Sequence, residues 1–83
     1  MTLRVTLYTK KDCHLCEGAR ALLEWLEYDF AVSIEEVDIT ADVALYARYR
    51  EAIPVVSIKG GATLSWPFDE GALRRALTQA GVS

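Results

Sequence analysis

Residues 8–16 read Tyr8-Thr-Lys-Lys-Asp-Cys-His-Leu-Cys16, and the organisation of the chain can be worked out from them. This segment holds both cysteines of the protein, Cys13 and Cys16, with the single histidine between them. Two thiols at this spacing, after a strand and at the beginning of a helix, are typical of thiol–disulfide chemistry. The flanking residues must then supply that strand and that helix.

The flanking residues have the required patterns. Apolar and polar residues alternate over positions 2–8, which predicts a strand. Over positions 13–30 the apolar residues, Leu15 included, recur at helical spacing along one stripe, which predicts a helix. We expect Asp12 to be the N-cap of this helix, which would put Cys13 in its first turn.

The rest of the chain completes an α/β pattern. The further elements expected are a strand at 33–39, a helix at 41–51 capped by Thr40, strands at 52–58 and 62–66, and a last helix capped by Asp69. Lys59-Gly60-Gly61 supplies a tight turn between the last two strands. The order β-α-β-α-β-β-α predicts a four-stranded mixed sheet flanked by three helices. Eighty-three residues leave room for a single domain, 1–83.

Composition and charge exclude several classes of function. A net charge of −3 without a basic cluster argues against nucleic-acid binding, and the doublet Arg74-Arg75 is interpreted as solvated surface. No stretch approaches the ~18 apolar residues that span a bilayer, and no signal peptide is visible. We therefore expect a cytoplasmic protein without membrane association. Trp25 and Tyr28 are expected in the core or at its half-buried edge.

Thiol–disulfide exchange requires one thiolate to attack and a second thiol to resolve the mixed disulfide. Backbone N–H groups and the helix dipole favour negative charge at the helix start, where Cys13 lies. Lys10 and Lys11 add positive charge nearby. We predict that the pKa of Cys13 lies below the free-thiol value of about 8.5, and that Cys16 is the buried resolving thiol. His14 either adds charge when protonated or is an exposed helix-start residue.

Other interpretations of these residues stay open. A structural zinc site needs four ligands, and two cysteines with one histidine between them supply fewer, so no metal site is expected in one chain. Two buried, unreactive thiols are a further alternative. The Ile53-Pro54 bond is either an ordinary trans peptide at the beginning of a strand or a cis peptide beside the cysteines. The cis form would leave the backbone groups of Ile53 free to pair with an extended substrate.

These segments together resemble a small glutaredoxin-like member of the thioredoxin superfamily. The resemblance is carried by Leu7-Tyr8-Thr9-Lys10, Cys13-His14-Leu15-Cys16, Ile53-Pro54-Val55 and Phe68-Asp69. It implies a thioredoxin-like fold of the glutaredoxin type, with Cys13 as nucleophile, Cys16 as resolving thiol and Pro54 in a cis peptide. It also implies ligand contacts from Lys10 and Asp69. The expected substrate-binding residues are therefore Lys10, His14, Ile53, Pro54 and Asp69.

The chain departs from the family pattern at three places. His14-Leu15 replaces the usual proline–aromatic pair, Ala52 replaces a threonine, and Trp66-Pro67 replaces the Gly-Gly that lets glutathione approach the backbone. The larger side chains of Trp66-Pro67 would fill the groove through which glutathione approaches the backbone. The combination is closer to a little-characterised glutaredoxin-like branch than to the glutathione-dependent enzymes.

The resemblance and the residues lead to three functional hypotheses. The first is a monomeric dithiol–disulfide oxidoreductase in which Cys13 and Cys16 act on protein or small-molecule disulfides. It requires no cofactor, and glutathione is a candidate reductant or ligand. The second is an iron–sulfur or thiol-ligand carrier of the same fold without strong reductase activity. The third is a redox-inert interaction module.

Overall fold

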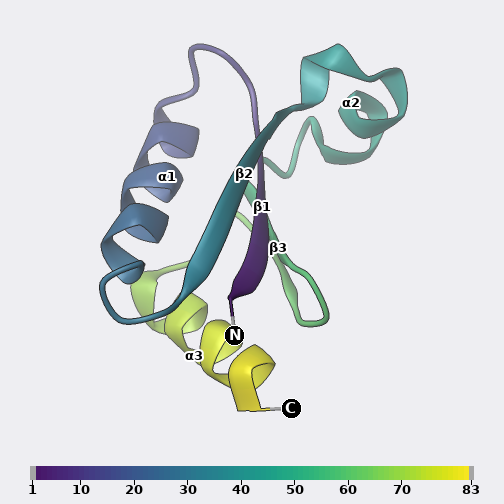
Figure 1. Ribbon diagram of the computed structural model, residues 1–83. Helices are drawn as coiled ribbons and strands as arrows, with labels where there is room; N and C mark the ends of the chain where they lie inside the picture. Colours follow the sequence, from purple (N-terminus) through teal and green to yellow (C-terminus); the bar gives the residue numbers. More distant parts are fainter. Residues whose placement is uncertain (1, 83) are drawn as a thin grey trace.

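The computed structural model describes residues 2–82, which form a sheet with helices on both sides (Figure 1). The elements are β1 Leu3–Thr9, α1 His14–Leu26, β2 Val32–Asp38, a 3₁₀ turn Ile39–Ala41, α2 Val43–Tyr49, β3 Val55–Ile58, β4 Thr63–Ser65 and α3 Glu70–Val82. The strand order is β2-β1-β3-β4, with β2 parallel to β1 and the other two pairings antiparallel. The predicted α/β architecture and element order are confirmed. Within residues 2–82, no helix has the length and apolar character needed to cross a membrane.

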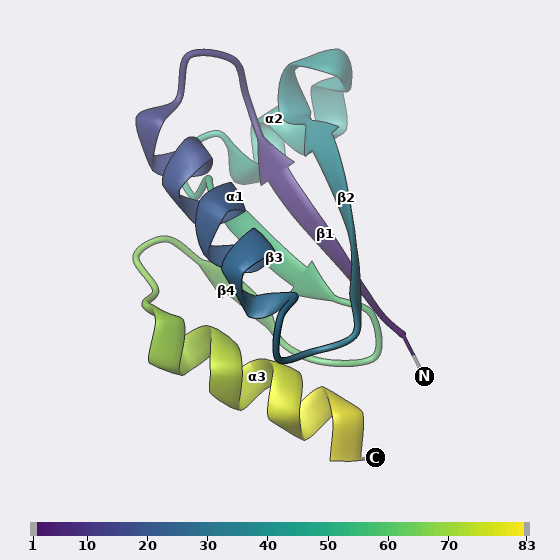
Figure 2. The same ribbon diagram turned by 60° about the vertical axis from the view of Figure 1, so that its left-hand side comes forward.

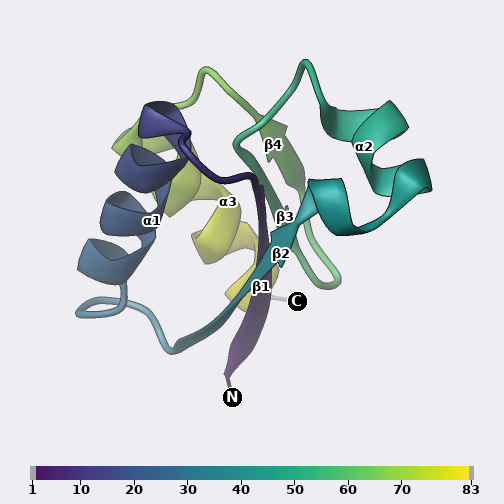
Figure 3. The ribbon, with the colours of Figure 1, turned by 90° about the horizontal axis from the view of Figure 1, so that it is seen from above.

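The side chains of β1 alternate between the two faces of the sheet. Val5 and Leu7 are buried on the face that α1 and α3 cover (Figure 2). Arg4, Thr6 and Tyr8 alternate with them and therefore point to the other face. Helix α2 lies on that second face (Figure 3), where the Tyr8 ring stacks on Tyr49 with 4.6 Å between ring centroids.

One hydrophobic core lies between the sheet and the helices α1 and α3. Its buried members are Val5, Leu7, Ala19, Leu23, Leu26, Val56, Ile58, Leu73, Ala76 and Leu77. They come from β1, α1, β3 and α3, so four segments far apart in the sequence depend on one another for burial. The apolar area removed from water here is the main favourable term in folding.

Helix α1 is shorter than the expected 13–30 and ends at Leu26. Residues 27–30 tighten into a turn in which the N–H groups of Asp29 and Phe30 both donate to the Leu26 carbonyl, at 3.0 and 2.9 Å. Phe30 still packs against the core from this turn. Leu15 belongs to the apolar stripe in the sequence, but it is 48% exposed, and its neighbour Cys16 takes the inward position. Successive helical residues are about 100° apart around the axis, so Leu15 points in a different direction from Cys16.

Helix α2 is also shorter than expected, and Thr40 is not its cap. Asp42 caps the helix, with its Oδ1 accepting from the Leu45 N–H at 3.0 Å. Thr40 lies in the preceding 3₁₀ turn and donates its hydroxyl to Asp38. Asp69 is confirmed as the cap of α3, because its Oδ1 accepts from the Ala72 N–H at 2.8 Å. Gly60 has φ 78° in the predicted turn between β3 and β4, a conformation that favours glycine.

One expectation about aromatic residues is wrong: Trp25 and Tyr28 are 56% and 84% exposed, instead of lying in the core or at its edge. The doublet Arg74-Arg75 lies at the surface as expected, with Arg75 exposed. The Arg74 guanidinium also binds the carboxylates of Asp29 and Glu70, each at 2.7 Å. These hydrogen bonds raise the pKa of Arg74, with the bond to Glu70 contributing most. Arg74 thereby connects the beginning of α3 to the turn that follows α1.

Leu23 and Leu15 provide a matched test of this packing, because they are the same residue type on the same helix. We predict that Leu23→Ala lowers the free energy of unfolding by about 2–5 kcal/mol, because it leaves a cavity in the core. Leu15→Ala should change it by less than about 0.5 kcal/mol. Urea denaturation of the disulfide form measures both values. Equal destabilisation by the two variants would contradict the assignment of the buried face of α1.

Candidate functional site

The loop from β1 to α1 brings the first cysteine to the helix start. Residues 11 and 12 form a turn, and Asp12 adopts the left-handed conformation with φ 57°. Cys13 then takes an extended conformation and is itself the N-cap of α1. The expectation that Asp12 caps the helix is therefore wrong. A left-handed residue turns the chain away from the helix axis, and the cap moves to the next position.

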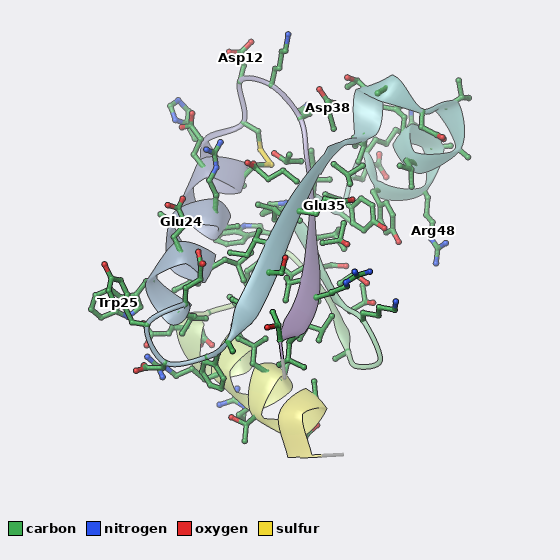
Figure 4. The ribbon with its side chains drawn as sticks, viewed as in Figure 1. Asp12, Glu24, Trp25, Glu35, Asp38 and Arg48 are labelled. Carbon is green, nitrogen blue, oxygen red and sulfur yellow. A yellow bond between two sulfur atoms is a disulfide. The ribbon has the colours of Figure 1, made fainter. Side chains whose placement is uncertain are left out.

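The two sulfur atoms lie together at the helix start. Cys13 and Cys16 form a disulfide, with 5.2 Å between their Cα atoms (Figure 4). The Cys16 N–H donates to the Cys13 sulfur at 3.2 Å, which is the capping hydrogen bond of α1. Cys13 is half-buried, whereas Cys16 is only 3% exposed and lies on the inner side of the helix. The backbone donor at the Cys13 sulfur would favour its negatively charged form after reduction.

The charged side chains of the loop point away from the protein interior. Lys10, Lys11 and Asp12 are all exposed, and Asp12 projects outward at the tip of the loop (Figure 4). The side-chain hydroxyl and then the N–H of Thr40 lower the pKa of the Asp38 carboxyl, and the charge of Lys11 lowers it further. Lys11 thus acts partly on Asp38 at the end of β2. The hydrogen bond from Cys16 is the more direct support for a Cys13 thiolate.

The two residues between the cysteines form the outer surface of the site. The His14 side chain is 99% exposed, with its Nδ1 3.6 Å from a Glu17 carboxylate oxygen. Leu15 beside it is about half exposed. The structure therefore places an imidazole and an apolar side chain where a molecule approaching the disulfide would meet them.

Pro54 lies at the same end of the sheet as the cysteine loop. Val55 pairs with Tyr8, so the beginning of β3 adjoins the end of β1 (Figure 3). The Ile53–Pro54 peptide is cis, as the resemblance implies, and Pro54 is buried. The Ile53 N–H donates to the Tyr49 carbonyl at 3.1 Å. The expectation that both backbone groups of Ile53 are free is therefore wrong for the N–H.

The segment between β4 and α3 reaches the same end of the molecule. The Trp66 N–H donates to the Pro54 carbonyl at 3.1 Å, and the Trp66–Pro67 peptide is a second cis bond that the sequence did not indicate. The half-buried Trp66 ring meets Phe68 edge-on, with 5.3 Å between centroids. Asp69 follows and uses one carboxylate oxygen to cap α3. Trp66 thus lies directly next to Pro54.

Tyr49 is a residue of this region that sequence reasoning missed. Its ring stacks on Tyr8, its carbonyl accepts the Ile53 N–H, and the Arg48 guanidinium lies 5.2 Å from its ring centroid. Helix α2 is therefore attached to both the end of β1 and the segment before Pro54. Its place on a helix follows from the helix predicted at 41–51, but its partner on β1 depends on tertiary structure.

Comparisons with known proteins agree with this geometry. The model of the Glutaredoxin-like domain (DUF836) family matches residues 4–78. The chain belongs to this glutaredoxin-like family. It is also similar to Northeast Structural Genomics target protein XcR50 from X. campestris, with 38% identity to the X-ray structure over 86% of this chain and 91% of that chain, at a TM-score of 0.75. The solution structure of XcR50 gives 38% identity, 86% and 87% coverage, and a TM-score of 0.72.

A Cys-x-x-Cys pair joined as a disulfide in a glutaredoxin-like domain fits a role in thiol redox chemistry. Within residues 2–82, no group of three or more His, Cys, Asp or Glu side chains is arranged to hold a metal ion. The placement of Lys10, His14, Ile53, Pro54 and Asp69 is now described, and their contact with a substrate stays a prediction.

The N-cap position of Cys13 generates a testable difference between the two thiols. In reduced Cys16→Ser, the backbone donor at position 16 is kept and Cys13 is the only thiol. We predict that its iodoacetamide reaction titrates with a midpoint below about 8.5, the free-thiol value. In Cys13→Ser, the buried Cys16 should react more slowly at every pH. A midpoint at or above the free-thiol value, or a faster Cys16, would contradict this assignment.

Proposed function

We propose that this glutaredoxin-like protein is a dithiol–disulfide oxidoreductase in which Cys13 is the nucleophile and Cys16 the resolving thiol. The observation that carries the proposal is the pairing of the two sulfurs at the start of α1, with the Cys16 N–H donating to Cys13. The difference in burial supports the order of the roles, because a disulfide substrate must reach the attacking sulfur from solvent.

The reductive reaction has two steps. The Cys13 thiolate attacks one sulfur of a substrate disulfide, forming a mixed disulfide and releasing the other substrate sulfur as a thiolate. The Cys16 thiolate then attacks the Cys13 sulfur, which breaks the mixed disulfide and releases the second substrate thiolate. The substrate gains two electrons, and the protein is left with the Cys13–Cys16 disulfide. An external thiol reductant must restore the dithiol.

Substrates in this proposal are disulfides of proteins or small molecules, and glutathione is the candidate reductant. The exposed His14 and Leu15 flank the disulfide and would contact such a substrate first. Lys10 lies exposed in the same loop, and Ile53, Pro54 and Asp69 belong to the neighbouring segments. We expect the protein to act as a cytoplasmic monomer, with no cofactor bound.

Single-turnover stoichiometry tests the two steps. Reduced protein is mixed with bis(2-hydroxyethyl) disulfide, and the released thiol and the protein mass are measured. We predict that the wild-type protein releases two thiols per chain and gains an internal disulfide. Cys16→Ser should release one thiol and keep a mercaptoethanol on Cys13, because nothing resolves the mixed disulfide. Cys13→Ser should react at least about tenfold more slowly, since its remaining thiol is buried.

Tyr46→Ala is a control that should keep the wild-type stoichiometry, because Tyr46 is an exposed residue of α2 outside the cysteine loop. If Cys13→Ser retained the wild-type rate, the assignment of the nucleophile would be wrong. A wild-type protein that released no thiol would support the redox-inert module instead. A coloured, oxygen-sensitive protein that loses its colour with Cys13 would support the iron–sulfur carrier.

A further inference from the structure

The outer face of α1 carries a surface patch far from the disulfide. Its members are Ala21, Glu24, Trp25, Glu27 and Tyr28, which line a hollow of about 460 Å³. We call this surface the Trp25 patch. Trp25 projects outward from the end of α1 that is remote from the disulfide (Figure 4). Trp25 lies nine positions after Cys16, which corresponds to about 14 Å along a helix.

The aromatic pair of the patch does not contribute to folding the core. Trp25 and Tyr28 are exposed and are absent from the core and from the residues packed against it. Their rings lie 5.7 Å apart between centroids, tilted by 55°, so each supports the other while its outer face stays open. Exposed aromatic rings next to one another on a small soluble domain are typical of binding surfaces.

The charge around the rings is negative. Glu24 and Glu27 border the rings, and neither forms an ion pair within residues 2–82. Arg20 lies with them along a neighbouring hollow, but its guanidinium is bound to Glu36 at 3.2 Å. The last turn of α1 contains no basic residue, and the carbonyl end of a helix carries partial negative charge. The patch therefore combines aromatic faces with uncompensated negative charge.

We propose that the Trp25 patch binds an arginine-containing basic segment of a partner protein. A guanidinium can stack on the face of an aromatic ring and bind a carboxylate at the same time, and this patch offers both groups side by side. Charge complementarity favours this binding partner, because the rings, the glutamates and the carbonyl end of the helix all attract a cation. The binding site is independent of the thiol chemistry, and it would hold the partner along the same helix that carries the disulfide.

Two other occupants fit the patch less well. A membrane surface would meet the aromatic rings, but Glu24 and Glu27 repel anionic lipid headgroups. A second copy of this chain carries a net charge of −3, which opposes docking on an acidic surface. Membrane binding and self-association would each give a distinct result in the experiments described next.

The two tryptophans of the chain make the test specific. The indole N–H signals of ¹⁵N-labelled protein are followed by NMR during titration with an acetylated (Gly-Arg)₄ amide peptide. We predict a saturable shift of the Trp25 signal, while the Trp66 signal stays in place. The same peptide with citrulline in place of arginine keeps the shape and loses the charge. It should bind at least about fivefold more weakly, because cation–π and ionic attraction both require the charge.

Matched variants separate the patch from general electrostatics. Glu24→Gln/Glu27→Gln should weaken peptide binding at least about fivefold, whereas Glu35→Gln/Glu51→Gln, with the same change in net charge, should not. Tyr28→Ala should weaken it, and Tyr46→Ala on α2 should not. All four proteins should keep the wild-type circular dichroism, because the altered side chains are exposed.

Several results would overturn the proposal. They are the absence of a Trp25 shift at millimolar peptide, equal binding of the citrulline peptide, and equal weakening by the two glutamine pairs. A Trp25 response to phosphatidylcholine–phosphatidylglycerol vesicles without one to the peptide would assign the patch to membranes. A dimer in sedimentation equilibrium that Tyr28→Ala dissociates would assign it to self-association. None of these readouts depends on the cysteines, so the proposed oxidoreductase function is unaffected by them.

Discussion

The burial of β1 between two neighbouring strands is the constraint on which the structure depends. β1 pairs with β2 along its whole length and with β3 over residues 5–8, so its middle part has a strand on each side. Val5 and Leu7 anchor it to the core under α1 and α3. Because β1 is fixed on both sides, its last residue delivers the cysteine loop to a defined place, next to the beginning of β3. The position of the sulfurs is therefore a consequence of how the centre of the sheet is packed.

Backbone groups supply much of the local environment of the two sulfur atoms. The helix start provides the Cys16 N–H at the Cys13 sulfur, and the neighbouring connections are held by the bonds from Ile53 to Tyr49 and from Trp66 to Pro54. Such an arrangement tolerates changes in the side chains between the cysteines, because their exposed positions contribute little to the packing.

Most of the fold could be predicted from the sequence, because strand alternation, helical spacing and turn residues are local signals. The candidate cysteines were also evident from their spacing. The sequence did not reveal that Asp12 would adopt a left-handed conformation and pass the cap to Cys13, because Asp is itself a preferred cap residue and its backbone conformation depends on the whole loop. Nor did it reveal that Trp25 would be exposed or that Arg74 would be paired. An aromatic residue beside an apolar stripe gives the same sequence pattern whether it is buried or exposed. The pair of Arg74 with Glu70 is local to α3, but Asp29 comes from another part of the chain.

In the function that we propose, Cys13 and Cys16 form a reversible two-electron couple and not a permanent structural disulfide. Equilibration of the protein in glutathione buffers of graded ratio, followed by acid trapping and mass measurement, gives the fraction carrying the internal disulfide at each potential. We predict a two-electron transition with a midpoint between about −270 and −120 mV, the range of redox-active proteins of this fold. A midpoint below about −300 mV, typical of structural disulfides, or no internal disulfide at any ratio, would contradict it.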